Sequence, residues 1–220
     1  QLSMVQVRLR PLGSPSFAVL AAMWDSVTRL VGRRPSIAVV QTTGDSFLAA
    51  GPFEGAGDAS ELTKQQAALQ VVALLRDLNE TTTVADDFRF TAVATAGAAS
   101  EGLIGQQHMS YRLFGAAVRG SNALLAAAPE ALGGRQNAAF ASDWFRRQHA
   151  NYAIENPLGG NSDGLKSAAV GPASAAASES PVGAVAEDSA TFGTAALWRA
   201  RGVGAVMISK IHLETPCAAA

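Results

Sequence analysis

Apolar and polar residues follow two different periods over the first part of the chain. Residues 4–9 alternate between the two kinds, which is the pattern of a half-buried β-strand. Residues 17–31 instead place apolar side chains at helical spacing, which predicts an amphipathic helix. Gly32 and Pro35 follow this stretch and are typical of a helix end. We therefore expect a strand followed by a helix.

A tight turn is predicted between the next two β-prone runs. Residues 37–40 and 46–49 are rich in apolar side chains, and Gly44 and Asp45 stand between them. Such a pair suits a tight turn, because glycine adopts positive φ angles and aspartate is a common turn residue. We therefore expect a β-hairpin with Asp45 at or near its tip.

The rest of the chain continues this mixture of helices and strands. We expect a helix over 60–79, a strand over 88–94, a helix over 115–128, a shorter helix over 138–150, and closing strands over 196–198 and 204–213. Elements in this order pack as layers around a sheet. The pattern therefore indicates an α+β or α/β domain with helices on one mixed sheet.

One long segment lacks the apolar side chains of a core. Residues 159–195 are rich in glycine, alanine, serine and proline. Such a segment gains little from burial to offset the entropy of ordering. We expect a flexible insertion there, within a single domain that covers residues 1–220.

Composition narrows the classes of function. The 220 residues are 48% hydrophobic and carry a net charge of −1, so the chain can bury a core but has no overall basic field for nucleic acid. No apolar run reaches the roughly 18 residues that a membrane-spanning helix needs. The amino end has no signal-peptide pattern, and a single cysteine forms no intrachain disulfide. We expect an intracellular protein more than a secreted one.

The cysteine and the histidines add little chemistry. Cys217 begins a Cys-Ala-Ala-Ala sequence that formally resembles a prenylation box, which chance explains well in so alanine-rich a chain. His108, His149 and His212 are widely spaced and form no metal-ligand pattern. We interpret all three histidines as surface or packing residues.

Two segments carry a recognisable set of motifs. Residues 40–47 read Val-Gln-Thr-Thr-Gly-Asp-Ser-Phe across the predicted hairpin. A second set keeps its spacing without a gap and consists of Gly97, Gly102, Gly105, Tyr111, Phe114, Gly115 and Val118. Together the segments resemble the catalytic domain of class III adenylate and guanylate cyclases. The resemblance extends over about residues 37–128.

The resemblance implies a ferredoxin-like α+β fold and a head-to-tail dimer that holds the nucleotide between its subunits. In that family two aspartates bind two metal ions, which activate the ribose hydroxyl and stabilise phosphate charge. Asp45 matches the second aspartate, whereas Arg10 occupies the position of the first, where a cation repels metal ions. No acidic residue occurs over 1–23, so a shifted register does not restore the pair.

The positions that the resemblance assigns to the nucleotide also depart from the family. Gln41 replaces the residue that reads the base, and Arg112 stands where an aspartate or cysteine completes base recognition. Arg119 replaces the asparagine that orients the ribose. Asn122 matches that asparagine only if the alignment is shifted. Ala123 replaces an arginine that stabilises the transition state, and loss of such a group costs about 2.7–4 kcal/mol.

These residues favour a pseudoenzyme: a degenerate cyclase domain without a cofactor that serves as a structural or regulatory subunit. Its expected protein partner forms a homodimer, a cyclase-like heterodimer or a larger complex. The first alternative is an active adenylate or guanylate cyclase that uses Mg or Mn with ATP or GTP and a competent partner subunit. The second is a non-catalytic ATP or GTP sensor that retains Asp45 and in which Gln41, Arg112 and Arg119 line the site. Arg10, Arg112 and Arg119 would then hold phosphate without metal.

Each of these residues also has a structural interpretation. Asp45 can be an ordinary turn residue without a metal. Gly97, Gly102 and Gly105 can belong to an ordinary connection between two strands. A metal role for Asp45 and a structural role therefore both stay open at the level of sequence.

Overall fold

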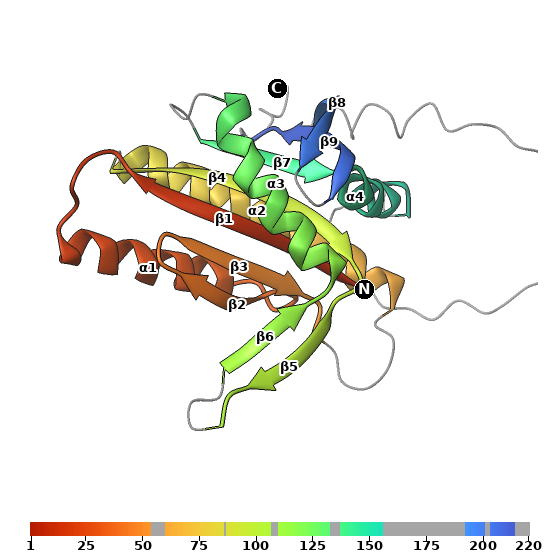
Figure 1. The fold of residues 1–220 in the computed structure, drawn as a ribbon, viewed down its shortest axis with the longest axis horizontal. Coiled ribbons are helices and arrows are strands. Elements are labelled where there is room, and N and C mark those ends of the chain that lie inside the picture. The colour runs from red at the N-terminus through yellow and green to blue at the C-terminus, as the bar shows by residue number, and fades with distance from the viewer. Residues whose placement is uncertain are drawn as a thin grey trace, which may run out of the picture.

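The computed structural model describes residues 1–53, 60–85, 87–106, 110–132, 137–155, 192–200 and 203–213. Within them a seven-stranded mixed sheet has the order β2-β3-β1-β4-β7-β9-β8, and β5 pairs with β6 in a separate hairpin (Figure 1). The strands are β1 (Leu2–Pro11), β2 (Ala38–Thr43), β3 (Ser46–Gly51), β4 (Phe88–Gly97), β5 (Ser100–Ile104), β6 (Ser110–Phe114), β7 (Ala138–Ser142), β8 (Phe192–Ala200) and β9 (Gly204–Ile211). The helices are α1 (Phe17–Gly32), α2 (Glu61–Ala85), α3 (Ala116–Leu132) and α4 (Asp143–Glu155).

The helices cover the two faces of the sheet unequally. α1, α2 and α4 share one face, where their apolar side chains form the largest core with those of the central strands. α3 packs on the opposite face and crosses β1 and β4 (Figure 1). Because side chains of a strand alternate between its faces, β1 serves both layers. Val5, Val7 and Leu9 enter the main core, and Met4 packs with Leu48 on the other face.

The elements predicted over the first half of the chain are confirmed. β1 and α1 cover the predicted strand and helix, and β2 and β3 form the predicted hairpin. Gly44 has φ +56° in the turn, the left-handed conformation that favours glycine. α2 begins where expected but extends to Ala85, six residues beyond the predicted end at 79. An α+β fold with one mixed sheet is therefore confirmed.

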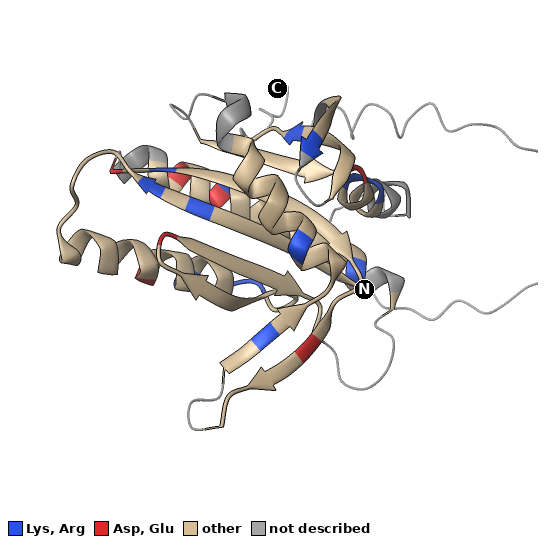
Figure 2. Ribbon diagram, viewed as in Figure 1, with Lys and Arg blue, Asp and Glu red and all other residues tan. Residues whose placement is uncertain are grey.

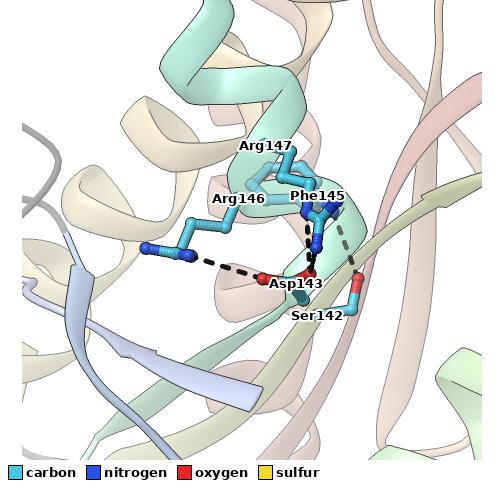
Figure 3. A network of polar contacts seen from close by, with 5 residues as sticks. All are labelled: Ser142, Asp143, Phe145, Arg146 and Arg147. Carbon is cyan, nitrogen blue, oxygen red and sulfur yellow. Dashed lines mark hydrogen bonds and ion pairs between the residues drawn. The ribbon is translucent and has the colours of Figure 1, made fainter. Parts of the chain in front are cut away.

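The helix predicted over 138–150 is wrong in its first part. Residues Ala138–Ser142 form strand β7, which pairs parallel with β4 and antiparallel with β9. All five residues of β7 are buried, so no polar alternation reveals the strand in the sequence. α4 begins directly after it, with Ser142 Oγ accepting from the Phe145 N–H at 3.3 Å (Figure 3).

Asp143 supports the start of α4 by ion pairs within the helix. Its carboxylate accepts from Arg147 Nε at 2.8 Å and from Arg146 Nη2 at 3.5 Å (Figure 3). An acidic side chain in the first turn also interacts favourably with the helix dipole. The abrupt change from strand to helix at 142 and 143 therefore has a local cause.

Two further features differ from the prediction. The glycine-containing segment after β4 folds into strands β5 and β6, which the expected order of elements omits. Residues 192–195, placed within the predicted insertion, form the start of β8. The remainder of that insertion, 159–191, lies outside the described residues, as do His108 and Cys217. None of the described helices combines the length and the apolar composition that crossing a membrane requires.

Candidate functional site

The turn between β2 and β3 lies beside the end of β1. The Leu9 N–H donates to the carbonyl oxygen of Asp45 at 2.7 Å, which extends the β1–β3 ladder up to the turn. Arg10 is the next residue along β1. The structure therefore brings Asp45 and Arg10, which the resemblance assigns to the two metal positions, to one corner of the sheet.

This corner is basic on the sheet face that α3 partly covers. Arg10 lies directly opposite Arg89 in the antiparallel pairing of β1 and β4. Arg8 lies two residues before Arg10 and therefore on the same face. Arg8 and Arg89 are not among the predicted site residues, although the spacing of Arg8 and Arg10 along the predicted strand already places both on one face. Arg89 joins them through the register of β4, which the sequence alone does not reveal.

A small apolar cavity lies under the turn, on the opposite side of β1. Its volume is about 40 Å³, and its lining includes Leu9, Leu20, Met23, Trp24 and Phe88 together with Asp45. Among the described residues, no three His, Cys, Asp or Glu side chains gather where they could hold a metal ion. The exposed Asp45 carboxylate, with largely apolar residues lining the cavity beside it, does not by itself supply the several oxygen ligands that a two-metal centre takes.

Gln41 lies on β2 and lines a second, polar cavity. The cavity has a volume of about 20 Å³, and its other polar residues include Gln6, Ser46 and Asn122. Gln41 Nε2 donates to Thr43 Oγ1 at 3.1 Å. A cavity of this volume has room for about one water molecule. The structure thus places Gln41 beside Asn122, the residue that matches the family only in a shifted register.

The other two predicted nucleotide residues lie elsewhere. Arg112 is on β6, where its Nε donates to Ser110 Oγ at 3.4 Å. Arg119 is exposed in the first turn of α3. Neither arginine lines the cavity that contains Gln41. Among the described residues, the cavity of Gln41 therefore includes neither of the two arginines.

The β5–β6 hairpin projects from the body of the domain (Figure 1). It carries an acidic position on β5 and a basic position on β6 (Figure 2). The Tyr111 hydroxyl donates to Glu101 Oε2 across the hairpin. Burial, then the hydrogen bond and charge of Glu101, raise the pKa of Tyr111 to about 12. Four large apolar side chains of the hairpin are exposed: Leu103, Ile104, Tyr111 and Phe114.

Solved structures of nucleotide cyclases share this architecture. The guanylate cyclase domain of RhGC from Catenaria anguillulae in complex with GTP superposes with a TM-score of 0.62 and 12% identity over 97% of both chains. The adenylyl cyclase CyaB from P. aeruginosa gives a TM-score of 0.59 and 10% identity, covering 98% of this chain and 95% of its own. This chain has the class III cyclase catalytic-domain fold. Neither the family models nor the curated proteins give a sequence match.

A dimeric form of the same fold is among the similar structures. The non-canonical dimeric guanylyl cyclase domain of the RhoGC fusion protein from the aquatic fungus Blastocladiella emersonii has a TM-score of 0.53 and 12% identity over 96% of both chains. At 10–12% sequence identity, these similarities show the fold alone. The similar structures therefore support the fold of this chain, whereas the roles of Arg10 and Asp45 stay predictions from the sequence.

Proposed function

We propose that this chain is a catalytically degenerate cyclase domain that acts as a structural or regulatory subunit of a larger assembly. The observation that carries the proposal is the position of Arg10, at the end of β1 and beside the turn that bears Asp45. Two metal ions at this corner need a second carboxylate, and a guanidinium there opposes their binding. The apolar lining under Asp45 supports the same conclusion.

The proposed partner is a second cyclase-fold subunit, either another copy of this chain or a related chain. The exposed apolar side chains of the β5–β6 hairpin favour a protein contact, because an isolated apolar projection gains from burial. In this arrangement the chain contributes its fold and its contact surface, and the partner contributes catalytic groups if any turnover occurs.

The test is a cyclase assay of the purified domain with ATP and with GTP, each in the presence of manganese. The expected result is no cyclic nucleotide above a blank without protein, while an active class III cyclase domain in parallel reactions gives product. Robust cyclic nucleotide formation by the pure domain would overturn the proposal. It would instead support the alternative of an active cyclase with divergent metal binding.

A further inference from the structure

The end of β1 beyond α3 presents two arginines on one face of the sheet. α3 reaches this face at Gln6, whose Oε1 accepts from Ser121 Oγ at 3.1 Å. Figure 1 shows α3 crossing the middle of β1, with the rest of the strand continuing past the helix. Arg8 and Arg10 follow Gln6 at every second position and therefore share its face. They lie about 7 Å apart along the strand.

The guanidinium groups of Arg8 and Arg10 form no hydrogen bond or ion pair with the described residues. Both side chains are half-buried, so solvent screens their charges less than it screens those of fully exposed arginines. Arg89 adds a third cation directly opposite Arg10, and its Nη1 donates to the Phe88 carbonyl at 2.9 Å. This cluster of Arg8, Arg10 and Arg89, the arginine face, concentrates positive charge in a chain whose net charge is −1.

The neighbours of the arginine face are polar and include acids at its margin. Ser46 on β3 and Thr91 on β4 lie directly opposite Arg8. Asp45 and Asp87 lie at the ends of the adjoining strands, and neither forms an ion pair with Arg8 or Arg10. The two unpaired cations therefore lack a protein counter-charge within the described residues.

We propose that the arginine face binds a chain of phosphoryl groups without a metal ion. Guanidinium groups donate paired hydrogen bonds to phosphate oxygens and stay charged at all physiological pH values. Their spacing along β1 suits two or three linked phosphoryl groups, because a single phosphate engages one arginine fully and a linked chain reaches both. The short extent of the basic surface disfavours a nucleic acid, which contacts a longer stripe of cations.

The inference rests on the proposed function in one respect, namely that Arg10 stands where an active cyclase has a metal-binding aspartate. Inorganic tripolyphosphate and nucleoside triphosphates share the chemistry that this face recognises. A nucleotide gains further affinity if its base and ribose also contact the protein. Equal affinity for both ligands therefore assigns the recognition to phosphate alone.

The experiment is calorimetric titration of the whole chain with sodium tripolyphosphate, and separately with ATP, at low salt and in the presence of EDTA. We expect metal-free binding that weakens at least tenfold in Arg8→Gln/Arg10→Gln. The matched control is Arg33→Gln/Arg199→Gln, which removes the same charge from two exposed arginines elsewhere and should leave the affinity within twofold. Arg8→Lys/Arg10→Lys, which keeps the charge but loses the guanidinium fork, should bind with intermediate affinity.

Two results would overturn the inference. One is no heat of binding for either ligand at millimolar concentration, with the wild-type chain folded by circular dichroism. The other is an equal loss of affinity in the arginine-face variant and the control, which assigns the binding to net charge. The titration contains no metal and measures no product. Neither result therefore bears on the proposed loss of cyclase activity, which the cyclase assay with manganese tests separately.

Discussion

Arg10 lies directly opposite Arg89 where β1 and β4 pair. Like charges on opposed positions of an antiparallel pair are destabilising, so this arrangement costs the protein folding free energy. The sequence resemblance assigns the position of Arg10 to a metal-binding aspartate. The proposed loss of metal binding therefore predicts that Arg10 can be replaced without loss of a catalytic function.

Replacing Arg10 is expected to stabilise the domain in the absence of ligand. Arg10→Thr removes the like-charge opposition to Arg89 and introduces a β-branched residue, and we expect a gain of about 0.5 kcal/mol in the free energy of unfolding. Urea unfolding of the variant and the wild type at low salt measures this difference in the free energy of unfolding. The matched control is Arg199→Thr, because Arg199 is on exposed β8 and lies opposite Ala205. An equal gain in both variants would assign the effect to β-propensity.

The exposed hairpin is expected to mediate self-association or pairing. Leu103 and Ile104 are 64% and 50% exposed on β5. Leu103→Ser/Ile104→Ser should shift the chain toward monomer in sedimentation velocity and leave thermal unfolding of the monomer within a few degrees. The control is Leu197→Ser/Met207→Ser, which removes 60% and 40% exposed side chains from the far edge of the sheet. If the control dissociates the assembly and the hairpin variant does not, the contact lies at that edge.

His149 is expected to make stability depend on pH. Burial, and then the charge of Arg76, lower the pKa of His149 from 6.5 to about 4 in the folded protein. The unfolded chain therefore binds more protons between pH 4 and 6.5, and stability falls as the pH falls through this window. A shift of this size amounts to roughly 3 kcal/mol at pH 4.

The measurement compares urea unfolding of the wild type and His149→Leu at pH 7 and at pH 4.5. The variant should lose less stability than the wild type over this interval, because it has no buried imidazole to protonate beside the Phe192 ring. His212→Leu changes an exposed histidine and should leave the wild-type pH dependence in place. Parallel losses in all three proteins would mean that His149 titrates normally in the folded state.

Asn137 is expected to stabilise the junction before β7. Its Oδ1 accepts from the Phe90 N–H at 3.0 Å, and its Nδ2 donates to Asn79 Oδ1 and Thr82 Oγ1 at 2.9 Å each. Asn137→Ala leaves these groups without their partner, and we expect a loss of about 2 kcal/mol in the free energy of unfolding. Asn122→Ala, which changes an exposed asparagine of α3, should stay within about 0.5 kcal/mol. Equal losses would contradict the role of Asn137 as a bridge.

The local elements of this protein are largely determined by its sequence. Alternation over 4–9, helical spacing over 17–31 and the Gly44 turn each depend on interactions between near neighbours, and the structure confirms all three. The motifs around 40–47 and 97–118 also identify the cyclase fold. β7 escaped prediction because its buried residues Ala138–Ser142 show no contrast between faces.

Tertiary structure decided which side chains meet. The presence of Arg8 and Arg10 on one face follows from strand period alone, but Arg89 joins them through the pairing of strands almost eighty positions apart in the sequence. Gln41 likewise meets Asn122 in one cavity, while Arg112 and Arg119 lie outside it. The register of distant strands and the docking of α3 depend on how the whole core packs, which no local pattern encodes.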